Sequence, residues 1–167
     1  MMTFIDDYTR MCWVYLLKNK SDAFQTFKNF HKWIENDAQS HIGSIRTDNG
    51  KEYTSNEFEH YLRQHGIKHQ TTVPYNPQQN GVAERMNRTI LNMVRSMLFC
   101  KNVKIMLWAD VVLCALYIKN RCPSNAIRNM TLLVSYNTSD YPITIVVIPL
   151  IYIVVPLLPT YCYFCAP

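Results

Sequence analysis

The order of apolar patterns along these 167 residues predicts an α/β fold. Three observations support this class. Two aromatic and β-branched runs flank a polar turn at the start, and apolar residues then recur at helical spacing. Short strand patterns alternate with helical patterns up to about residue 120. Such alternation is typical of domains in which helices cover the faces of a sheet.

The first 38 residues predict a β-hairpin followed by a helix. Residues 3–5 and 11–17 are the apolar runs, and the polar stretch Asp6–Arg10 is the turn between them. Ser21 is a residue type that caps helices, and it precedes a helical pattern from about residue 22 to residue 38. The expected buried face of this helix comprises Ala23, Phe27, Phe30 and Ile34.

The middle of the chain alternates between strand and helix patterns. "IGSIRTDNG" predicts a short strand that ends in a turn, "SNEFEHYLRQHG" a helix that Gly66 terminates, and "IKHQTTV" another strand. Two long helices are then predicted, from about residue 82 to 100 and from about 105 to 120. Their expected buried residues are Met86, Ile90, Met93 and Met97 in the first, and Trp108, Val111, Val112, Ala115 and Ile118 in the second.

The composition changes after Arg128. Residues 141–164 carry no charge and are long enough to cross a bilayer, so a membrane anchor is one alternative for this stretch. Four prolines in the stretch suit neither a regular helix nor a central strand: Pro142, Pro149, Pro156 and Pro159. We therefore predict a domain over residues 3–127 and an apolar tail over residues 128–167 that belongs to no recognised domain.

Charge and cysteine content favour an intracellular protein with a polyanionic partner. The 17 lysines and arginines all lie between Arg10 and Arg128, whereas residues 131–167 hold one charge, Asp140. No secretory signal is apparent, and the six cysteines are scattered. Cys162 and Cys165 form a C-x-x-C without a second pair, which argues against a zinc site.

Two acidic residues stand out by their position. Asp48 lies where a predicted strand ends, and Glu84 lies on the first turn of a long predicted helix. In α/β folds, ligand-binding sites lie at the carboxyl ends of the strands. Two carboxylates that converge there are suited to Mg²⁺ or Mn²⁺, which prefer oxygen ligands and assist phosphoryl transfer.

Each acid also has a purely structural interpretation. Asp48 precedes Asn49-Gly50 and would serve as the first residue of an Asx turn. Glu84 would be a favourable acid against the positive end of its helix dipole. Taken singly, each structural interpretation is the stronger one, so the case for a site depends on the two acids together.

Four segments in order carry a family resemblance. They read "FIDDYTR", "IRTDNGKEYTSNEF", "HGIKHQTTVPYNPQQNGVAERMNRTI" and "LWADVVLCALYIKNRCPSNAI", and 35 residues separate Asp48 from Glu84. Over residues 3–127 the chain resembles the integrase core of copia-type retrotransposon polyproteins. The resemblance implies a ribonuclease-H-like fold, a mixed sheet flanked by helices. It also implies DNA integration: Mg²⁺-dependent 3′-processing and strand transfer of retrotransposon DNA.

The same resemblance implies roles for individual residues. Asp48 and Glu84 match two catalytic, metal-binding carboxylates of a site that holds two Mg²⁺ or Mn²⁺ ions in intact members. Contacts with DNA are implied for Asn49, Lys51, Tyr75, Gln78, Asn80 and Arg88, of which Tyr75, Gln78 and Asn80 match a mobile loop. The implied partners are retrotransposon ends, target DNA and further copies of the chain, in the nucleus. Arg88 is equally well explained by an ion pair with Glu84 four residues earlier.

One part of the family pattern is absent. The first carboxylate of the family lies on the first strand of the sheet, ahead of the hairpin that begins here at Thr3. We therefore expect a sheet without its first strand and a copy that does not join DNA, or a non-catalytic nucleic-acid-binding remnant. Asp6 and Asp7 are interpreted as hairpin-turn residues and not as replacements for the missing carboxylate.

Overall fold

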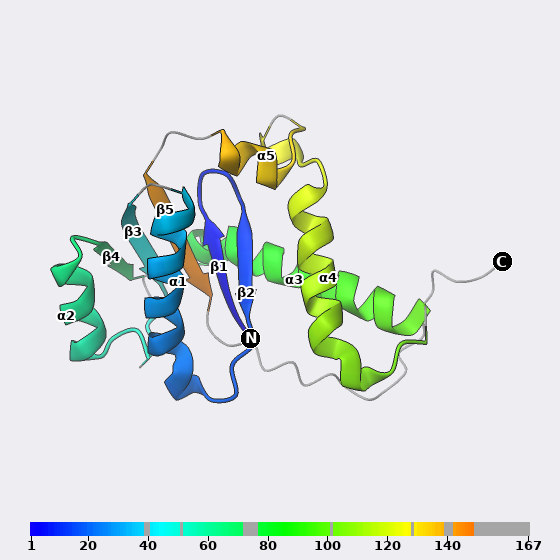
Figure 1. Ribbon diagram of the computed structural model, residues 1–167, viewed down its shortest axis with the longest axis horizontal. Helices are drawn as coiled ribbons and strands as arrows, with labels where there is room; N and C mark the ends of the chain where they lie inside the picture. Colours follow the sequence, from blue (N-terminus) through cyan, green and yellow to red (C-terminus); the bar gives the residue numbers. More distant parts are fainter. Residues whose placement is uncertain are drawn as a thin grey trace.

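A mixed sheet with helices on both faces organises the chain in the computed structural model (Figure 1). The structure describes residues 1–38, 41–50, 52–71, 77–100, 102–127, 129–138 and 142–148. Within these ranges five strands form the sheet in the order β2-β1-β5-β3-β4. Their bounds are Met2–Asp6 for β1, Cys12–Tyr15 for β2, Ile42–Thr47 for β3, Lys68–Thr71 for β4 and Ile143–Ile148 for β5.

The predicted hairpin is present as strands β1 and β2. The strands pair antiparallel with Met2 opposite Tyr15 and Ile5 opposite Cys12. All five residues of β1 are buried, because helices cover both faces of the sheet at this point. The outer edge of β2 is covered by Asn120, whose amide nitrogen donates to the Cys12 carbonyl at 2.8 Å and whose oxygen accepts from the Cys12 amide at 3.3 Å. One side chain of a neighbouring helix thus satisfies the outward-facing amide and carbonyl of Cys12 at this edge.

Strand β5 lies in the middle of the sheet, between β1 and β3. It pairs antiparallel with β1 and parallel with β3, although more than 90 residues separate it from either strand. The expectation that prolines exclude this segment from a central strand is wrong. Pro142 and Pro149 lie just outside the strand, so each of its six residues retains the amide hydrogen that a central strand donates.

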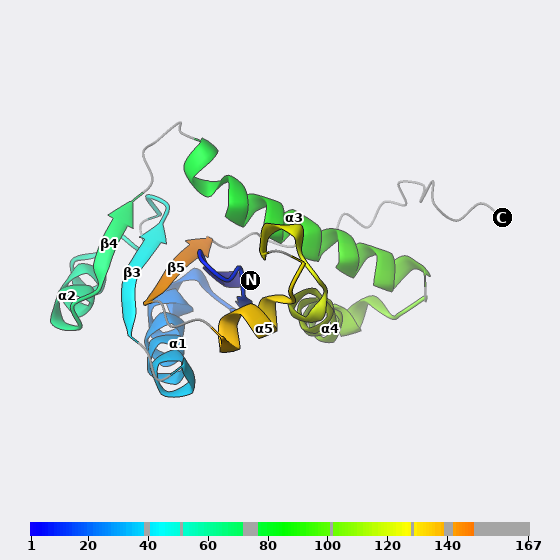
Figure 2. The same ribbon diagram turned by 90° about the horizontal axis from the view of Figure 1, so that it is seen from above.

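One face of the sheet is covered by α1 (Ala23–Ala38), α2 (Asn56–Gln64) and α5 (Leu132–Asn137) (Figure 2). A 3-10 turn, Lys20–Asp22, precedes α1, so Ser21 lies inside this turn and Asn19 takes the cap position. Ser55 caps α2, and Gly66 follows it with a positive φ of 67°. The four residues predicted for the buried face of α1 are each 0 % exposed: Ala23, Phe27, Phe30 and Ile34.

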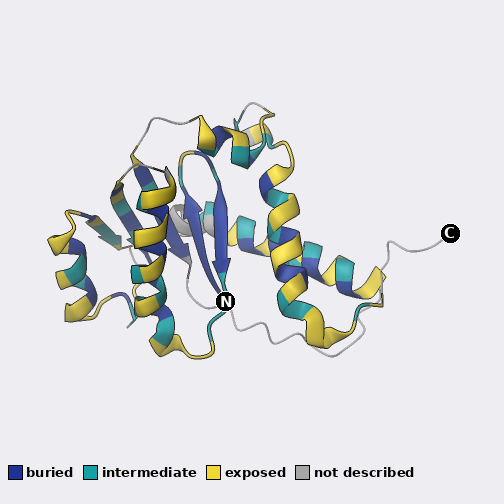
Figure 3. Ribbon diagram, viewed as in Figure 1, coloured by how far each residue is buried: buried dark blue, intermediate teal, exposed yellow. Residues whose placement is uncertain are grey.

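The opposite face is covered by α3 (Pro77–Cys100) and α4 (Trp108–Arg121). The predicted stripe on α3 is shifted, because Ile90, Val94 and Leu98 are the buried residues while Met86, Met93 and Met97 are only partly buried. On α4, Ile118 was expected to be buried but is 41 % exposed. Figure 3 shows the buried strands between helices whose outer sides are exposed.

The apolar stretch 141–164 does not form one membrane-crossing helix, because Ile143–Ile148 is a strand of the sheet. No helix among the described residues has the length and apolar character needed to cross a bilayer.

Candidate functional site

Asp48 lies directly after β3, at the carboxyl end of that strand. Strand β3 buries Ile45 and Thr47, and the half-buried Asp48 is the first residue of the turn that follows. Its Oδ1 accepts a hydrogen bond from the Gly50 amide at 3.1 Å. The Asx turn considered from the sequence is therefore present, and it holds the carboxylate in one orientation.

A second carboxylate lies beside Asp48. A side chain on Gly50 would meet Glu52 Oε2 at 3.0 Å and Asp48 Oδ1 at 3.1 Å, so the two acidic groups flank this glycine. Burial raises the pKa of Asp48, and the charge of Glu52 adds to the increase, whereas the Gly50 amide and Lys20 act in the opposite direction. A cation bound here would offset the electrostatic repulsion between the carboxylates of Asp48 and Glu52.

Glu84 lies on α3, where its side chain is exposed. The register of this part of α3 is set three residues later by the buried Asn87, whose Oδ1 accepts a hydrogen bond from the Thr3 hydroxyl at 3.0 Å. Helix α3 is therefore attached to β1 by a specific polar contact as well as by its apolar side chains.

The strand register relates this contact to Asp48. Thr3 is paired with Ile148, and Val146 is paired with Arg46, so Ile148 is level with Asp48 across β5. Thr3, Ile148 and Asp48 thus occupy one row across three neighbouring strands. In Figure 2 the arrowheads of β3, β4 and β5, which mark the carboxyl ends of these strands, point toward α3.

The strand between Thr3 and Asp48 has an apolar sequence at this end of the sheet. Val146 is buried against the residues of α3 and α4, and position 148 is an isoleucine. Within the described residues, no group of three histidine, cysteine or acidic side chains is arranged to hold a metal ion. The donors at this end of the sheet are carboxylate oxygens, which suit Mg²⁺ or Mn²⁺, but a third carboxylate is lacking on β5.

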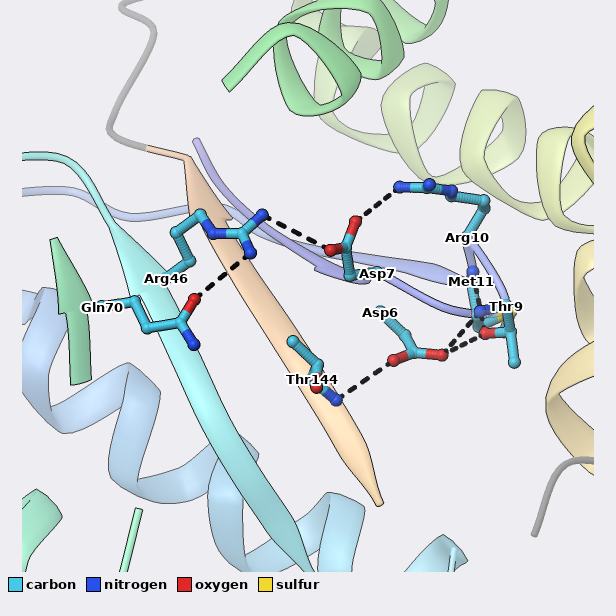
Figure 4. Close-up of polar contacts among 8 residues, drawn as sticks. All are labelled: Asp6, Asp7, Thr9, Arg10, Met11, Arg46, Gln70 and Thr144. Carbon is cyan, nitrogen blue, oxygen red and sulfur yellow. Dashed lines mark hydrogen bonds and ion pairs between the residues drawn. The ribbon is translucent and has the colours of Figure 1, made fainter. Parts of the chain in front are cut away.

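Asp6 stabilises the hairpin turn (Figure 4). Its Oδ2 accepts hydrogen bonds from the amide and the hydroxyl of Thr9, and its Oδ1 accepts from the Thr144 amide at 3.3 Å. Alternation along β1 places Asp6 on the same face as Phe4, which packs against α1, and therefore on the opposite face from Thr3 and α3. Asp6 is thus the last residue of β1 and not part of the turn, and its carboxylate stabilises the turn that follows.

Asp7 is also occupied by neighbouring groups. Its carboxylate pairs with Arg10 at 2.6 Å and with Arg46 at 3.4 Å, as Figure 4 shows. Its amide donates to the Thr144 carbonyl at 2.8 Å. Thr144 pairs with Ser44, four residues before Asp48, which corresponds to about 13 Å along the strand. Neither Asp6 nor Asp7 can therefore take the place of a third carboxylate beside Asp48.

The residues with implied DNA contacts are distributed as follows. Asn49 and Arg88 are both exposed, the first after β3 and the second on α3. Gln78 and Asn80 were expected in a loop, but α3 begins at Pro77 and includes both. Lys51 and Tyr75 lie outside the described residues.

The alternative role of Arg88 is not observed. Among the ion pairs of the described part of the chain, none joins Glu84 to Arg88.

Three residues beneath Asp48 were not identified from the sequence. Thr47, His69 and Glu59 are connected by hydrogen bonds and come from β3, β4 and α2. They are separated by 10 and 22 positions, and only the pairing of β3 with β4 brings them together. No regular spacing in the sequence predicts this cluster.

Curated relatives match most of the chain. The Retrovirus-related Pol polyprotein from transposon TNT 1-94 of Nicotiana tabacum is 51% identical over 123 residues, which are 74% of this chain and 9% of that polyprotein. The corresponding polyprotein from transposon RE2 of Arabidopsis thaliana is 39% identical over 121 residues, 72% of this chain and 8% of its own length. The chain thus spans less than a tenth of the length of these relatives.

Solved structures confirm the fold. A chain of the simian T-cell lymphotropic virus intasome aligns with a TM-score of 0.69 at 21% identity, over 84% of this chain and 49% of that one. The HTLV-2 integrase catalytic core domain, solved in complex with magnesium, aligns with a TM-score of 0.61 at 23% identity, over 80% of this chain and 82% of that one. The expected ribonuclease-H-like fold is therefore present. The model of the family described as "Integrase core domain" matches residues 1–77, and this match together with the curated relatives supports an integrase core of the kind found in retrotransposon Pol polyproteins.

Proposed function

We propose that this chain is an integrase-type core that does not join DNA ends. It binds a divalent cation through Asp48 and Glu84, and it binds DNA through basic residues of α3. The observation that carries the proposal is the position of β5. This strand occupies the place between β1 and β3 where the family resemblance implies a strand with the first carboxylate. Its residue on the face of α3 nearest this end is the buried Val146, and none of its six residues is acidic.

The fold supports the approach of Glu84 to Asp48. Thr3 and Asp48 lie two strands apart in one row, which corresponds to about 10 Å at the usual strand spacing. Glu84 precedes Asn87, the partner of Thr3, by three residues, or about 4.5 Å along the helix axis. Because α3 crosses the sheet with its amino-terminal end on the side of β3 and β4 (Figure 2), this displacement is toward Asp48. A single cation can then contact both carboxylates.

The cation would activate an attacking oxygen and stabilise the leaving oxygen of a phosphodiester. Asp48 and Glu84 would hold the ion, and exposed basic residues of α3 would hold the phosphate backbone: Arg85, Arg88 and Arg95. Two carboxylates offset the repulsion between two dications less well than three. Joining should therefore fail even though one cation is bound.

Joining is tested with a labelled oligonucleotide that mimics a retrotransposon end, in Mg²⁺ and in Mn²⁺. We expect no joined product from this chain. A product that disappears in the Asp48→Asn variant would overturn the proposal, because it would show that two carboxylates on this sheet suffice. A chain with Ile148→Asp is the informative comparison, since the register places residue 148 beside Asp48.

DNA binding is tested by measuring affinity against salt concentration. Removing one bond between the protein and a DNA phosphate should lower the slope of log affinity against log salt by about 0.9. We expect this reduction for Arg88→Ala and none for Arg63→Ala, which removes an exposed arginine of α2 on the other face of the sheet. Equal slopes for both variants and for the unmodified chain would remove Arg88 from the DNA-binding surface.

The nucleus is the location that this proposal requires, because target DNA lies there. Assembly with further copies of the chain belongs to the same proposal. It is supported by the resemblance to an intasome chain and is tested by light scattering with and without DNA.

A further inference from the structure

We propose that Glu59, His69 and Thr47 form a positioning relay that fixes the backbone of Asp48. The relay extends the proposed function, because it assigns residues that orient the metal-binding carboxylate without touching the ion. Its members come from three elements that meet only in the folded chain: α2, β4 and β3.

The contacts run in sequence from the surface to Asp48. Glu59 Oε1 is hydrogen-bonded to His69 Nδ1, His69 Nε2 lies 2.9 Å from the Thr47 hydroxyl, and that hydroxyl donates to the Asp48 carbonyl at 3.0 Å. Thr47 is fully buried, and the His69 side chain is 8 % exposed. The ring of Phe58 packs edge-on against the imidazole with centroids 5.6 Å apart. These neighbours leave the imidazole little freedom to rotate.

The hydrogen atoms determine the direction of each bond. The Thr47 hydroxyl has one hydrogen, which it donates to the Asp48 carbonyl, and its oxygen is also within hydrogen-bonding distance of His69 Nε2. The Glu59 carboxylate oxygen is an acceptor, so Nδ1 donates.

Asp48 is therefore held at two points, one on its backbone and one on its side chain. The relay fixes the peptide plane after Asp48 through its carbonyl, and the Gly50 amide fixes the side chain through Oδ1 at 3.1 Å. A site with few ligands depends strongly on such orientation, because each misplaced ligand removes a large share of the coordination.

The test compares Mn²⁺ binding of the full chain with that of Thr47→Val, which removes the hydroxyl at nearly constant volume, and of His69→Gln. Binding is followed by the broadening of amide signals around Asp48 in two-dimensional NMR spectra. Hydrogen exchange of the Gly50 amide is recorded on the same samples without metal. Thr47→Ser, which keeps the hydroxyl, is the rescue variant. Ser44→Ala removes a hydroxyl from the same strand, where it contacts Thr144 at 3.3 Å, and serves as the control.

We expect Thr47→Val and His69→Gln to weaken Mn²⁺ binding about fivefold and to speed exchange at Gly50, since each variant interrupts the hydrogen bonds that lead to the Asp48 carbonyl. Thr47→Ser and Ser44→Ala should behave like the unmodified chain. If folded Thr47→Val retains both the affinity and the exchange rate, the relay does not exist. If the unmodified chain binds no Mn²⁺, the proposed metal site fails, and exchange at Gly50 alone then decides for or against the relay.

Discussion

Replacing Ile145 by alanine tests whether β5 belongs to the folded core. Ile145 is 0 % exposed, lies in the central strand between Asp6 of β1 and Ile45 of β3, and packs in the core beneath α1. Truncating a fully buried isoleucine removes apolar contacts and leaves a cavity, which costs about 3 kcal/mol of unfolding free energy. With a urea dependence of about 2 kcal/mol per molar, the midpoint of unfolding should fall by about 1.5 M.

The assay is urea unfolding followed by tryptophan fluorescence, because Trp13 is buried in the same core as Ile145. Ile118→Ala is the matched control. Ile118 is 41 % exposed on α4, and its truncation should change stability by no more than about 0.5 kcal/mol. An Ile145→Ala midpoint equal to that of Ile118→Ala would refute the reasoning, because it would mean that residues 143–148 lie outside the cooperative core.

Three further predictions concern the acidic residues and the row beside Asp48. Asp6→Ala should lower the unfolding free energy by about 1–3 kcal/mol, because it leaves the Thr9 and Thr144 amides without their acceptor, and thermal unfolding would show this as a lower midpoint. Ile148→Asp should raise Mn²⁺ affinity at least about tenfold, because the backbone register brings position 148 to the end of the sheet that holds Asp48, and calorimetry that finds no change would show that a carboxylate at this position does not reach the ion. Asp48→Asn should become more stable relative to the unmodified chain as pH rises above 3.8, the ordinary pKa, since burial raises the pKa of Asp48 and its ionised form then opposes folding. A stability difference that does not vary with pH would show that Asp48 titrates alike in the folded and unfolded chain.

Local patterns in the sequence were sufficient for most elements. The hairpin, α1 with its four buried residues, β3, α2 and β4 follow from periodicity and turn residues, because these signals arise within a few positions of each other. The pairing of Asp48 with Glu84 as the candidate site also came from the sequence, through their spacing and the surrounding segments. The boundaries of α3 and the exact buried residues of α3 and α4 were less well predicted, because they depend on how each helix is oriented against the sheet.

The tertiary structure decided the role of the C-terminal segment and the surroundings of Asp48. A run such as "ITIVVI" has no preference of its own for a tail, a membrane or a central strand, and here the open hydrogen-bonding edges of β1 and β3 selected the strand. The same insertion placed a strand without acidic residues between β1 and β3. The relay of Glu59, His69 and Thr47 likewise depends on the pairing of β3 with β4. Contacts between residues far apart in the chain form only when the strands are paired, and this is why the sequence alone did not predict them.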